Sequence, residues 1–241
     1  GVGKTTTAVN LSASIAAAEK KVLLIDIDPQ GNSTSGMGFN KERANGTIYH
    51  ALLRGSGLKE IIQKTDLAFL DLVISNTDLI GAEVELIQEK DRERKLDRLI
   101  KEVASDYDYI FIDCPPSLGL LTINSLTAAH SVIIPLQCEY YALEGLGQLL
   151  KTIRLIKQSL NPKLEIEGIL LTMFDGRNNL SHQVADEVKK HFKDKVFNTI
   201  IPRNIRLSEA PSHGKPVLLY DIHSKGAETY LNLAREIMTN G

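Results

Sequence analysis

Apolar residues along this chain form short, nearly continuous runs separated by longer segments. The first run spans Lys21 to Asp28, and similar runs recur at Tyr109 to Asp113, Ser131 to Leu136 and Ile166 to Met173. Strands that are apolar at almost every position are typical of a parallel sheet covered on both faces. A further short strand or pair of strands is expected within Ala68 to Ser75.

Helical patterns occupy the segments between these runs. An Ala-rich stretch from Thr5 to Glu19 precedes the first strand, and Gly119 to Ala129 and Ala142 to Leu160 separate later ones. The alternation predicts an α/β fold: a doubly wound, mostly parallel sheet with helices on both faces. Pro29 to Gly46, rich in Gly, Asn and Ser, is predicted to be a long loop. Glu89 to Glu102 is predicted to be a solvated amphipathic helix.

Composition limits the classes of protein that remain. A chain of 241 residues, 43% hydrophobic and 24% charged, fits one α/β domain over 1–241. A formal net charge of -2 means that any nucleic-acid binding must come from a local basic patch. Cys114 and Cys138 are too few for a disulfide framework and lack metal-ligand spacing, which favours a reducing cytoplasm. No apolar run approaches a membrane span of roughly 18 residues, and no signal segment opens the chain.

The chain opens on a glycine-rich stretch directly before a predicted helix, Gly1-Val2-Gly3-Lys4-Thr5-Thr6. Glycines let backbone N–H groups approach phosphates, Lys4 can bridge the outer phosphates, and the Thr5 hydroxyl can ligate Mg²⁺. An ordinary Gly-rich helix start is the alternative. Because a phosphate loop follows a buried strand, we expect that strand and the first loop residues upstream of Gly1, outside this sequence.

Two aspartates stand at the ends of predicted strands. Asp113 ends the strand that begins at Tyr109, where a carboxylate could help to hold the Mg²⁺ ion that accompanies a nucleotide. Alternatively, Asp113 caps the helix that follows. Asp28 ends the first strand beside the expected nucleotide site, where a carboxylate can position the attacking water. Alternatively, Asp28 is an ordinary loop aspartate whose side chain hydrogen-bonds to nearby backbone. The turn from Pro115 to Gly119 is placed to sense the γ-phosphate, or is a plain connection.

Five segments together resemble the ParA/Soj family of chromosome- and plasmid-partitioning ATPases, which carry a deviant Walker A loop. These segments are GVGKTTTAVNL, LLIDIDPQGNSTSGMG, YDYIFIDCPPSLG, IIPLQCEYYALEG and IPRNIRLSEAPSHGKPVLLYD, and the resemblance covers nearly the whole chain. It implies that Gly1 through Thr6 bind nucleotide, with Lys4 as the phosphate-loop lysine and Thr5 as the magnesium ligand. It also makes Asp28 the water-positioning aspartate and Asp113 the Walker B aspartate. The family's signature lysine would lie two residues before Gly1, outside this sequence.

The resemblance also implies ATP as substrate and Mg²⁺ as cofactor, in a homodimer that sandwiches the nucleotide. Non-specific DNA binding by that dimer, a ParB-type centromere-binding partner and a cytoplasmic, nucleoid-associated location follow from the same resemblance. Arg177 and Arg206 match the family's basic DNA contacts; ion pairs within the chain, with Asp175 and Glu209 close in sequence, are the alternative. Pro202 and Asn204 are expected by the same analogy to flank the adenine base.

Four other functions compete with this interpretation. A MinD-like membrane-cycling ATPase would need a Lys-rich amphipathic C-terminal helix, whereas Tyr230 to Met238 is predicted to pack on the core, so no stable membrane association is expected. A nitrogenase-reductase-like electron donor would need cluster cysteines. A non-enzymatic DNA-binding module would bind nucleotide only as a structural ligand, and the presence of Asp28 at the loop argues against this class. An amidoligase-type relative would carry extra substrate-binding sequence.

Overall fold

The computed structural model describes residues 1–42, 46–139 and 142–240, and it confirms the predicted α/β class with a mostly parallel sheet. One sheet has four strands in the order β2-β3-β1-β4, in which β1 pairs in parallel with β3 and β4, and β2 runs antiparallel to β3. A second sheet pairs β5 and β6 in parallel. The strands are β1 Val22–Asp26, β2 Ile62–Lys64, β3 Leu70–Val73, β4 Tyr109–Asp113, β5 Ser131–Gln137 and β6 Glu165–Thr172.

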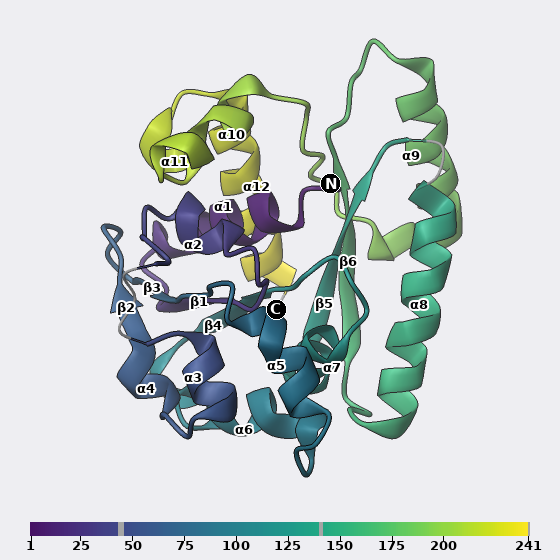
Figure 1. The fold of residues 1–241 in the computed structure, drawn as a ribbon. Helices are drawn as coiled ribbons and strands as arrows, with labels where there is room; N and C mark the ends of the chain where they lie inside the picture. The colour runs from purple at the N-terminus through teal and green to yellow at the C-terminus, as the bar shows by residue number, and fades with distance from the viewer. Residues whose placement is uncertain (43–45, 140–141, 241) are drawn as a thin grey trace.

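Helices cover both faces of the larger sheet and flank the smaller one (Figure 1). The α1, α2, α10, α11 and α12 helices lie on one side, α3 to α7 on the other, and α8 and α9 beside β5 and β6. Their bounds are α1 Lys4–Ala16, α2 Asn32–Gly36, α3 Ile48–Leu53, α4 Leu58–Ile61, α5 Leu79–Leu86, α6 Lys95–Lys101, α7 Leu120–Ala128, α8 Ala142–Ser159, α9 Asn179–Phe192, α10 Ile205–Glu209, α11 Val217–Tyr220 and α12 Lys225–Asn240.

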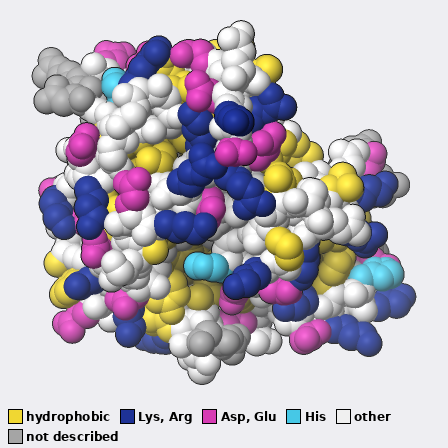
Figure 2. All heavy atoms as spheres, turned by 90° about the horizontal axis from the view of Figure 1, so that it is seen from below, with side chains coloured by type: hydrophobic (Ala, Val, Ile, Leu, Met, Phe, Trp, Pro, Cys, Tyr) yellow, Lys and Arg dark blue, Asp and Glu magenta, His cyan; other side chains and the backbone are white. Residues whose placement is uncertain are grey.

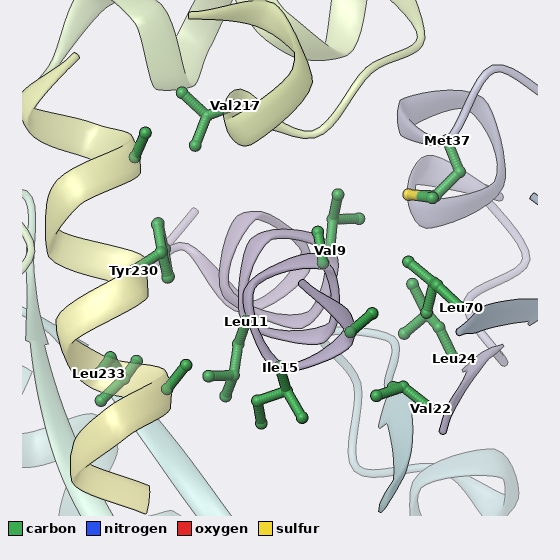
Figure 3. Close-up of a cluster of buried hydrophobic side chains, with 14 of the residues drawn as sticks. Val9, Leu11, Ile15, Val22, Leu24, Met37, Leu70, Val217, Tyr230 and Leu233 are labelled. Carbon is green, nitrogen blue, oxygen red and sulfur yellow. The ribbon is translucent and has the colours of Figure 1, made fainter. Parts of the chain in front are cut away.

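The unbroken apolar run of β1 is explained by two cores, one on each face of the sheet. Leu24 packs with α1 and α12, whereas Leu23 and Ile25 pack with the helices of the opposite face. Figure 3 shows the first of these cores, where α1 lies between β1 and the last helix. There the hydroxyl of buried Tyr230 lies 3.1 Å from Thr7 Oγ1. The prediction that the final helix packs on the core is confirmed.

Three local predictions differ from the structure. The loop predicted at Pro29 to Gly46 contains the short helix α2, and its residues 43–45 lie outside the described part of the chain. The helix predicted at Glu89 to Glu102 is shorter, because Asp91 adopts a left-handed φ of 52° and a 3₁₀ turn precedes α6. The first strand ends at Asp26, so Asp28 lies in the turn that follows it rather than in the strand.

The face around α6 is solvated, as predicted. Arg98 pairs with Asp91 at 2.7 Å and Lys101 pairs with Asp97 at 2.8 Å. Figure 2 views the molecule from below and shows Lys and Arg side chains interspersed with Asp and Glu. Such exposed pairs contribute little to stability.

The edges of β4 and β5 that face each other carry no hydrogen-bonded ladder among the described residues. Four of the five residues of β4 are only half-buried, although β1, its neighbour, is buried throughout. The larger sheet therefore ends at β4, with the smaller sheet beyond it (Figure 1).

Candidate functional site

The glycine-rich loop leads directly into α1. Gly3 holds a left-handed φ of 87°, which glycine adopts without steric cost, and the helix starts at Lys4. The first turn of α1 has no acidic residue and no side-chain cap, so its backbone N–H groups are open to an anion. Thr172 at the end of β6 donates from Oγ1 to Val2 O at 2.9 Å and anchors the loop.

Asp113 lies at the centre of the candidate site. It is 2% exposed, and its Oδ2 accepts a hydrogen bond of 2.8 Å from Ser33 Oγ. Burial raises the pKa of Asp113, while hydrogen bonds from the Ser33 and Thr5 hydroxyls and the charge of Lys4 act to lower it, and the charge of Asp28 raises it. The structure thus brings together Lys4, Thr5, Asp28 and Asp113, which the sequence places in three separate segments.

Asp26 joins this cluster, and Asp28 has a defined place in it. Asp26 is fully buried, and burial, followed by the neighbouring charge of Asp113, raises its pKa to about 7. Asp28 is 6% exposed and its Oδ1 accepts a hydrogen bond of 2.9 Å from Gln30 N. The local backbone bond that was the alternative for Asp28 is therefore present, and it orients the carboxylate beside the phosphate loop.

Oxygen donors of the kind that Mg²⁺ prefers meet at this site. The Thr5 hydroxyl lies near enough to the Asp113 carboxylate to lower its pKa, so the two oxygen donors sit close to one another. Across the described ranges, no group of three or more His, Cys, Asp or Glu side chains could hold a metal ion. Mg²⁺ is usually bound through one or two protein oxygens together with substrate phosphates and water, so the residues present fit it.

Two cavities bear on the predicted nucleotide contacts, and one of them adjoins the loop. One, of about 440 Å³, starts at Thr5 and Thr6 and runs between α1, α2 and residues 210–215. The other, of about 470 Å³, is lined by Phe174, Pro202 and residues of α12. Pro202 thus lines a cavity close to the end of β6, whereas Asn204 caps α10 by accepting hydrogen bonds from Arg206 N and Leu207 N. The roles of Pro202 and Asn204 toward a base stay predictions.

The two arginines considered for DNA contact are both engaged within the chain. Arg177 donates from Nε and Nη2 to Asp175 at 3.0 and 2.9 Å, and its side chain is 90% exposed. Arg206 pairs with Glu209 at 2.9 Å and with Asp221 at 3.1 Å. The pairs with Asp175 and Glu209 are those that the sequence offered as the alternative, and the pair with Asp221 was not predicted. Exposed pairs are weak, so both guanidinium groups stay available to a polyanion.

Sequence reasoning missed three hydroxyl residues that surround the aspartates: Ser33, Thr34 and Ser75. Each is fully buried. The hydroxyl-rich segment after Asp28, Asn32-Ser33-Thr34-Ser35, was a signal for the first two. Ser75 gave no local signal, because it follows β3 and approaches Asp28 only in the fold.

No helix within the described residues is long and apolar enough to cross a bilayer. Both cysteines are free thiols, Cys138 buried and Cys114 half-buried. Burial raises the pKa of Cys114 to about 12, so its thiol stays protonated.

Comparisons of the sequence with known proteins find partitioning proteins at high identity. The sequence model of a family described as AAA domain matches residues 1–166. The chain is 60% identical over 238 residues to the chromosome partitioning protein ParA of Myxococcus xanthus, covering 99% of this chain and 84% of that protein. It is 58% identical over 241 residues to the sporulation initiation inhibitor protein Soj of Bacillus subtilis, covering 100% and 95%. The chromosome-partitioning ATPase Soj of Treponema pallidum is 52% identical over 238 residues, with coverage of 99% and 93%.

Solved structures share the fold. A cobyrinic acid a,c-diamide synthase from Mycobacterium smegmatis with bound ADP and magnesium aligns with a TM-score of 0.87 at 36% identity, covering 100% of this chain and 90% of that one. The septum site-determining protein MinD from Pyrococcus horikoshii, complexed with Mg-ADP, aligns at 0.80 with 27% identity, covering 98% and 91%. These two neighbours represent the amidoligase and MinD alternatives, and both are less similar in sequence than the partitioning proteins.

Proposed function

This chain belongs to the ParA/Soj family of chromosome-partitioning ATPases, and we propose that ATP hydrolysis at its phosphate loop controls its own dimerisation and its binding to DNA. One observation carries the catalytic part of this proposal: Lys4, Thr5 and Asp28 gather around buried Asp113 at the start of α1. The arrangement suits phosphoryl transfer, which needs positioned charges more than covalent chemistry.

ATP binds through the loop from Gly1 to Thr6. The N–H groups at the start of α1 have no side-chain cap and would donate to the phosphates, and Lys4 would supply the main positive side chain. Thr5 would ligate Mg²⁺ directly, and Asp113 would support the ion from its surrounding shell. Mg²⁺ held there would neutralise phosphate charge during transfer. Mg²⁺ and ADP accompany the related folds already described, which supports ATP and Mg²⁺ as ligands here.

Asp28 orients the water that attacks the γ-phosphate. Its carboxylate lies in the turn after β1, close enough to Asp113 for the two charges to interact. The Gln30 N–H fixes one of its oxygens and so limits the directions in which the group can point. A held carboxylate lowers the entropic cost of placing a water molecule in line. Pro202 lines the cavity that would take the adenine, and Asn204 supports the same turn by capping α10.

DNA binding belongs to the ATP-bound dimer. The chain has a formal net charge of -2, so a single copy offers DNA little overall attraction. Two copies of Arg177 and Arg206 on one face would form a basic surface that contacts phosphates without reading sequence. A ParB-type protein that binds a centromere-like site would stimulate hydrolysis and release the dimer. The protein would then act on the nucleoid, in the cytoplasm.

We also propose that residues 1–241 form one domain whose sheet is completed by chain upstream of Gly1. The facing edges of β4 and β5 support this, because each lacks a ladder partner among the described residues. A parallel strand between them would cover the half-buried residues of β4 and deliver the chain to the phosphate loop. The residues encoded before Gly1 test this directly: an apolar strand followed by Lys-Gly is expected, and a polar or proline-rich segment would exclude it.

Steady-state ATP hydrolysis by the full-length protein, with and without DNA and the ParB-type partner, tests the proposed function. We expect Mg²⁺-dependent release of phosphate that rises when both are added. ATP binding without turnover under every condition would identify a non-enzymatic DNA-binding module.

A further inference from the structure

Three fully buried polar side chains form a network behind the catalytic aspartate. Asp26 ends β1, Thr34 lies in α2, and Ser75 follows β3, so the network joins three separate elements. A buried polar group destabilises the fold unless it is hydrogen-bonded. The side chains of Asp26 and Thr34 bond to each other, Ser75 reaches Thr34 through its backbone N–H, and the Ser75 hydroxyl bonds the main chain of Asp28.

Each group in the network has a defined partner. Asp26 Oδ2 accepts hydrogen bonds from Thr34 N at 2.8 Å and Thr34 Oγ1 at 2.7 Å. The Thr34 hydroxyl in turn accepts from Ser75 N at 3.0 Å. Thr34 Oγ1 therefore donates to one element and accepts from another, which fixes α2 between the ends of β1 and β3.

The network holds Asp28 by its main chain. Asp28 N donates to Asp26 Oδ1 at 3.1 Å, and Asp28 O accepts from Ser75 Oγ at 2.6 Å. A second donor, Gly31 N, reaches the same carbonyl at 2.8 Å. The backbone N–H and the backbone carbonyl of Asp28 are thus both hydrogen-bonded to buried partners. These bonds fix the main chain of Asp28 and so limit the direction of its side chain.

We propose that Ser75 is a positioning residue for ATP hydrolysis, which holds Asp28 in place through the Ser75 Oγ to Asp28 O hydrogen bond with Thr34 as its support. This inference rests on the proposed role of Asp28. Ser75 itself touches neither phosphate nor the attacking water. Because transfer depends on the placement of groups to within about 1 Å, a loosened Asp28 should slow turnover while the phosphate loop still binds nucleotide.

The test compares Ser75→Ala with Asp28→Ala and with Ser14→Ala, all in the full-length protein. Ser14 is a matched control, since it is also a buried serine whose hydroxyl donates to a backbone carbonyl, Asn10 O at 2.7 Å, but it lies in the second half of α1. We expect Ser75→Ala to lower kcat on the order of tenfold or more, with ATP and ADP affinities by calorimetry unchanged within about twofold. Ser14→Ala should keep the wild-type kcat.

A second pair of variants addresses a purely structural role. Thr34→Val removes the hydroxyl at nearly constant volume, and Thr34→Ser keeps it. We expect Thr34→Val to lower kcat at unchanged nucleotide affinity, and Thr34→Ser to restore most of the turnover. A Ser75→Ala variant with the kcat of Ser14→Ala would overturn the proposal. So would parallel losses of kcat, nucleotide affinity and melting temperature, because these would indicate general destabilisation.

The Asp28→Ala variant distinguishes failure of the Ser75 role from failure of the proposed function. Loss of turnover in Asp28→Ala but not in Ser75→Ala would remove only the positioning role of Ser75. Wild-type turnover in Asp28→Ala would contradict the proposed catalytic function and, with it, the role of Ser75.

Discussion

Asp26 and Asp113 are register partners on the parallel strands β1 and β4, so two buried carboxylates end neighbouring strands at one edge of the sheet. Burial is the largest cause that raises the pKa of each carboxyl. The hydroxyls of Thr34 and Ser33 lower these two pKa values, for Asp26 and Asp113 respectively, without removing the shift. The candidate site therefore concentrates acidic groups where Lys4 and a divalent cation would offset them.

The raised pKa of Asp26 makes stability depend on pH. A carboxyl whose pKa rises on folding from 3.8 to about 7 binds its proton more tightly in the folded state. Its contribution to stability is complete below about pH 4 and is lost as pH rises through about 7. Lowering the pH from about 7.5 to about 5 without Mg²⁺ should therefore stabilise the wild type relative to Asp26→Asn by about 2 kcal/mol. Urea unfolding of both proteins at the two pH values measures this, and an identical pH response would contradict it.

Lys4→Ala should strongly weaken nucleotide binding. The backbone N–H groups at the start of α1 remain in this variant, but the phosphates lose their main positive side chain. We expect ATP affinity by calorimetry to fall on the order of 100-fold, from the loss of charge-assisted hydrogen bonds. Lys20→Ala, an exposed lysine after the same helix, is the matched control and should bind as the wild type. Unchanged affinity of Lys4→Ala would remove Lys4 from the site.

Asp28→Ala should separate binding from hydrolysis. Without the carboxylate that positions water, turnover should fall on the order of 100-fold or more, while the phosphate loop still binds ATP. The ATP-bound dimer should then accumulate, as seen by sedimentation velocity. Asp66→Ala, at an exposed position, serves as control. Wild-type turnover of Asp28→Ala, with DNA and partner present, would count against its assigned role.

Arg177→Glu and Arg206→Glu should weaken DNA binding without preventing ATP-driven dimerisation. Each change reverses a charge on the proposed basic face, and contacts to phosphate release counterions, so wild-type affinity should fall steeply with salt. Arg98→Glu is the matched control, because Arg98 is also exposed and ion-paired but belongs to α6 at the opposite end of the molecule (Figure 1). Biosensor titration against unrelated DNA duplexes provides the readout. Full affinity of both variants would place the DNA surface elsewhere.

The sequence predicted the layers of the fold because the strands are buried on both faces. Leu23 and Leu24 are both fully buried, on opposite sides of β1, so the apolar run needs no alternation. The glycine-rich loop and the two aspartates of the candidate site were also recognisable, because Asp113 ends one apolar run and Asp28 ends another. Each of these features lies within one short segment of the chain, so the sequence alone reveals it.

The missed features depend on contacts between distant segments. The α2 helix has only five residues and its start is held by the Asp26 carboxylate, a tertiary contact that no propensity reveals. Ser75 lies 47 positions from Asp28 in the sequence, yet its hydroxyl bonds that residue's carbonyl. The β2 strand has three residues and is defined by its antiparallel pairing with β3. Local patterns cannot report such pairings.

The DNA affinity of Asp28→Ala, measured in the full-length protein with ATP and with ADP over a range of salt concentrations, decides whether the bound nucleotide controls DNA binding. If ATP controls DNA binding, the ATP-bound variant should be dimeric and bind unrelated duplexes, with an affinity that falls steeply as salt increases. The ADP-bound form should be monomeric and bind weakly. Equal DNA affinity in the two nucleotide states would show that ATP does not control DNA binding.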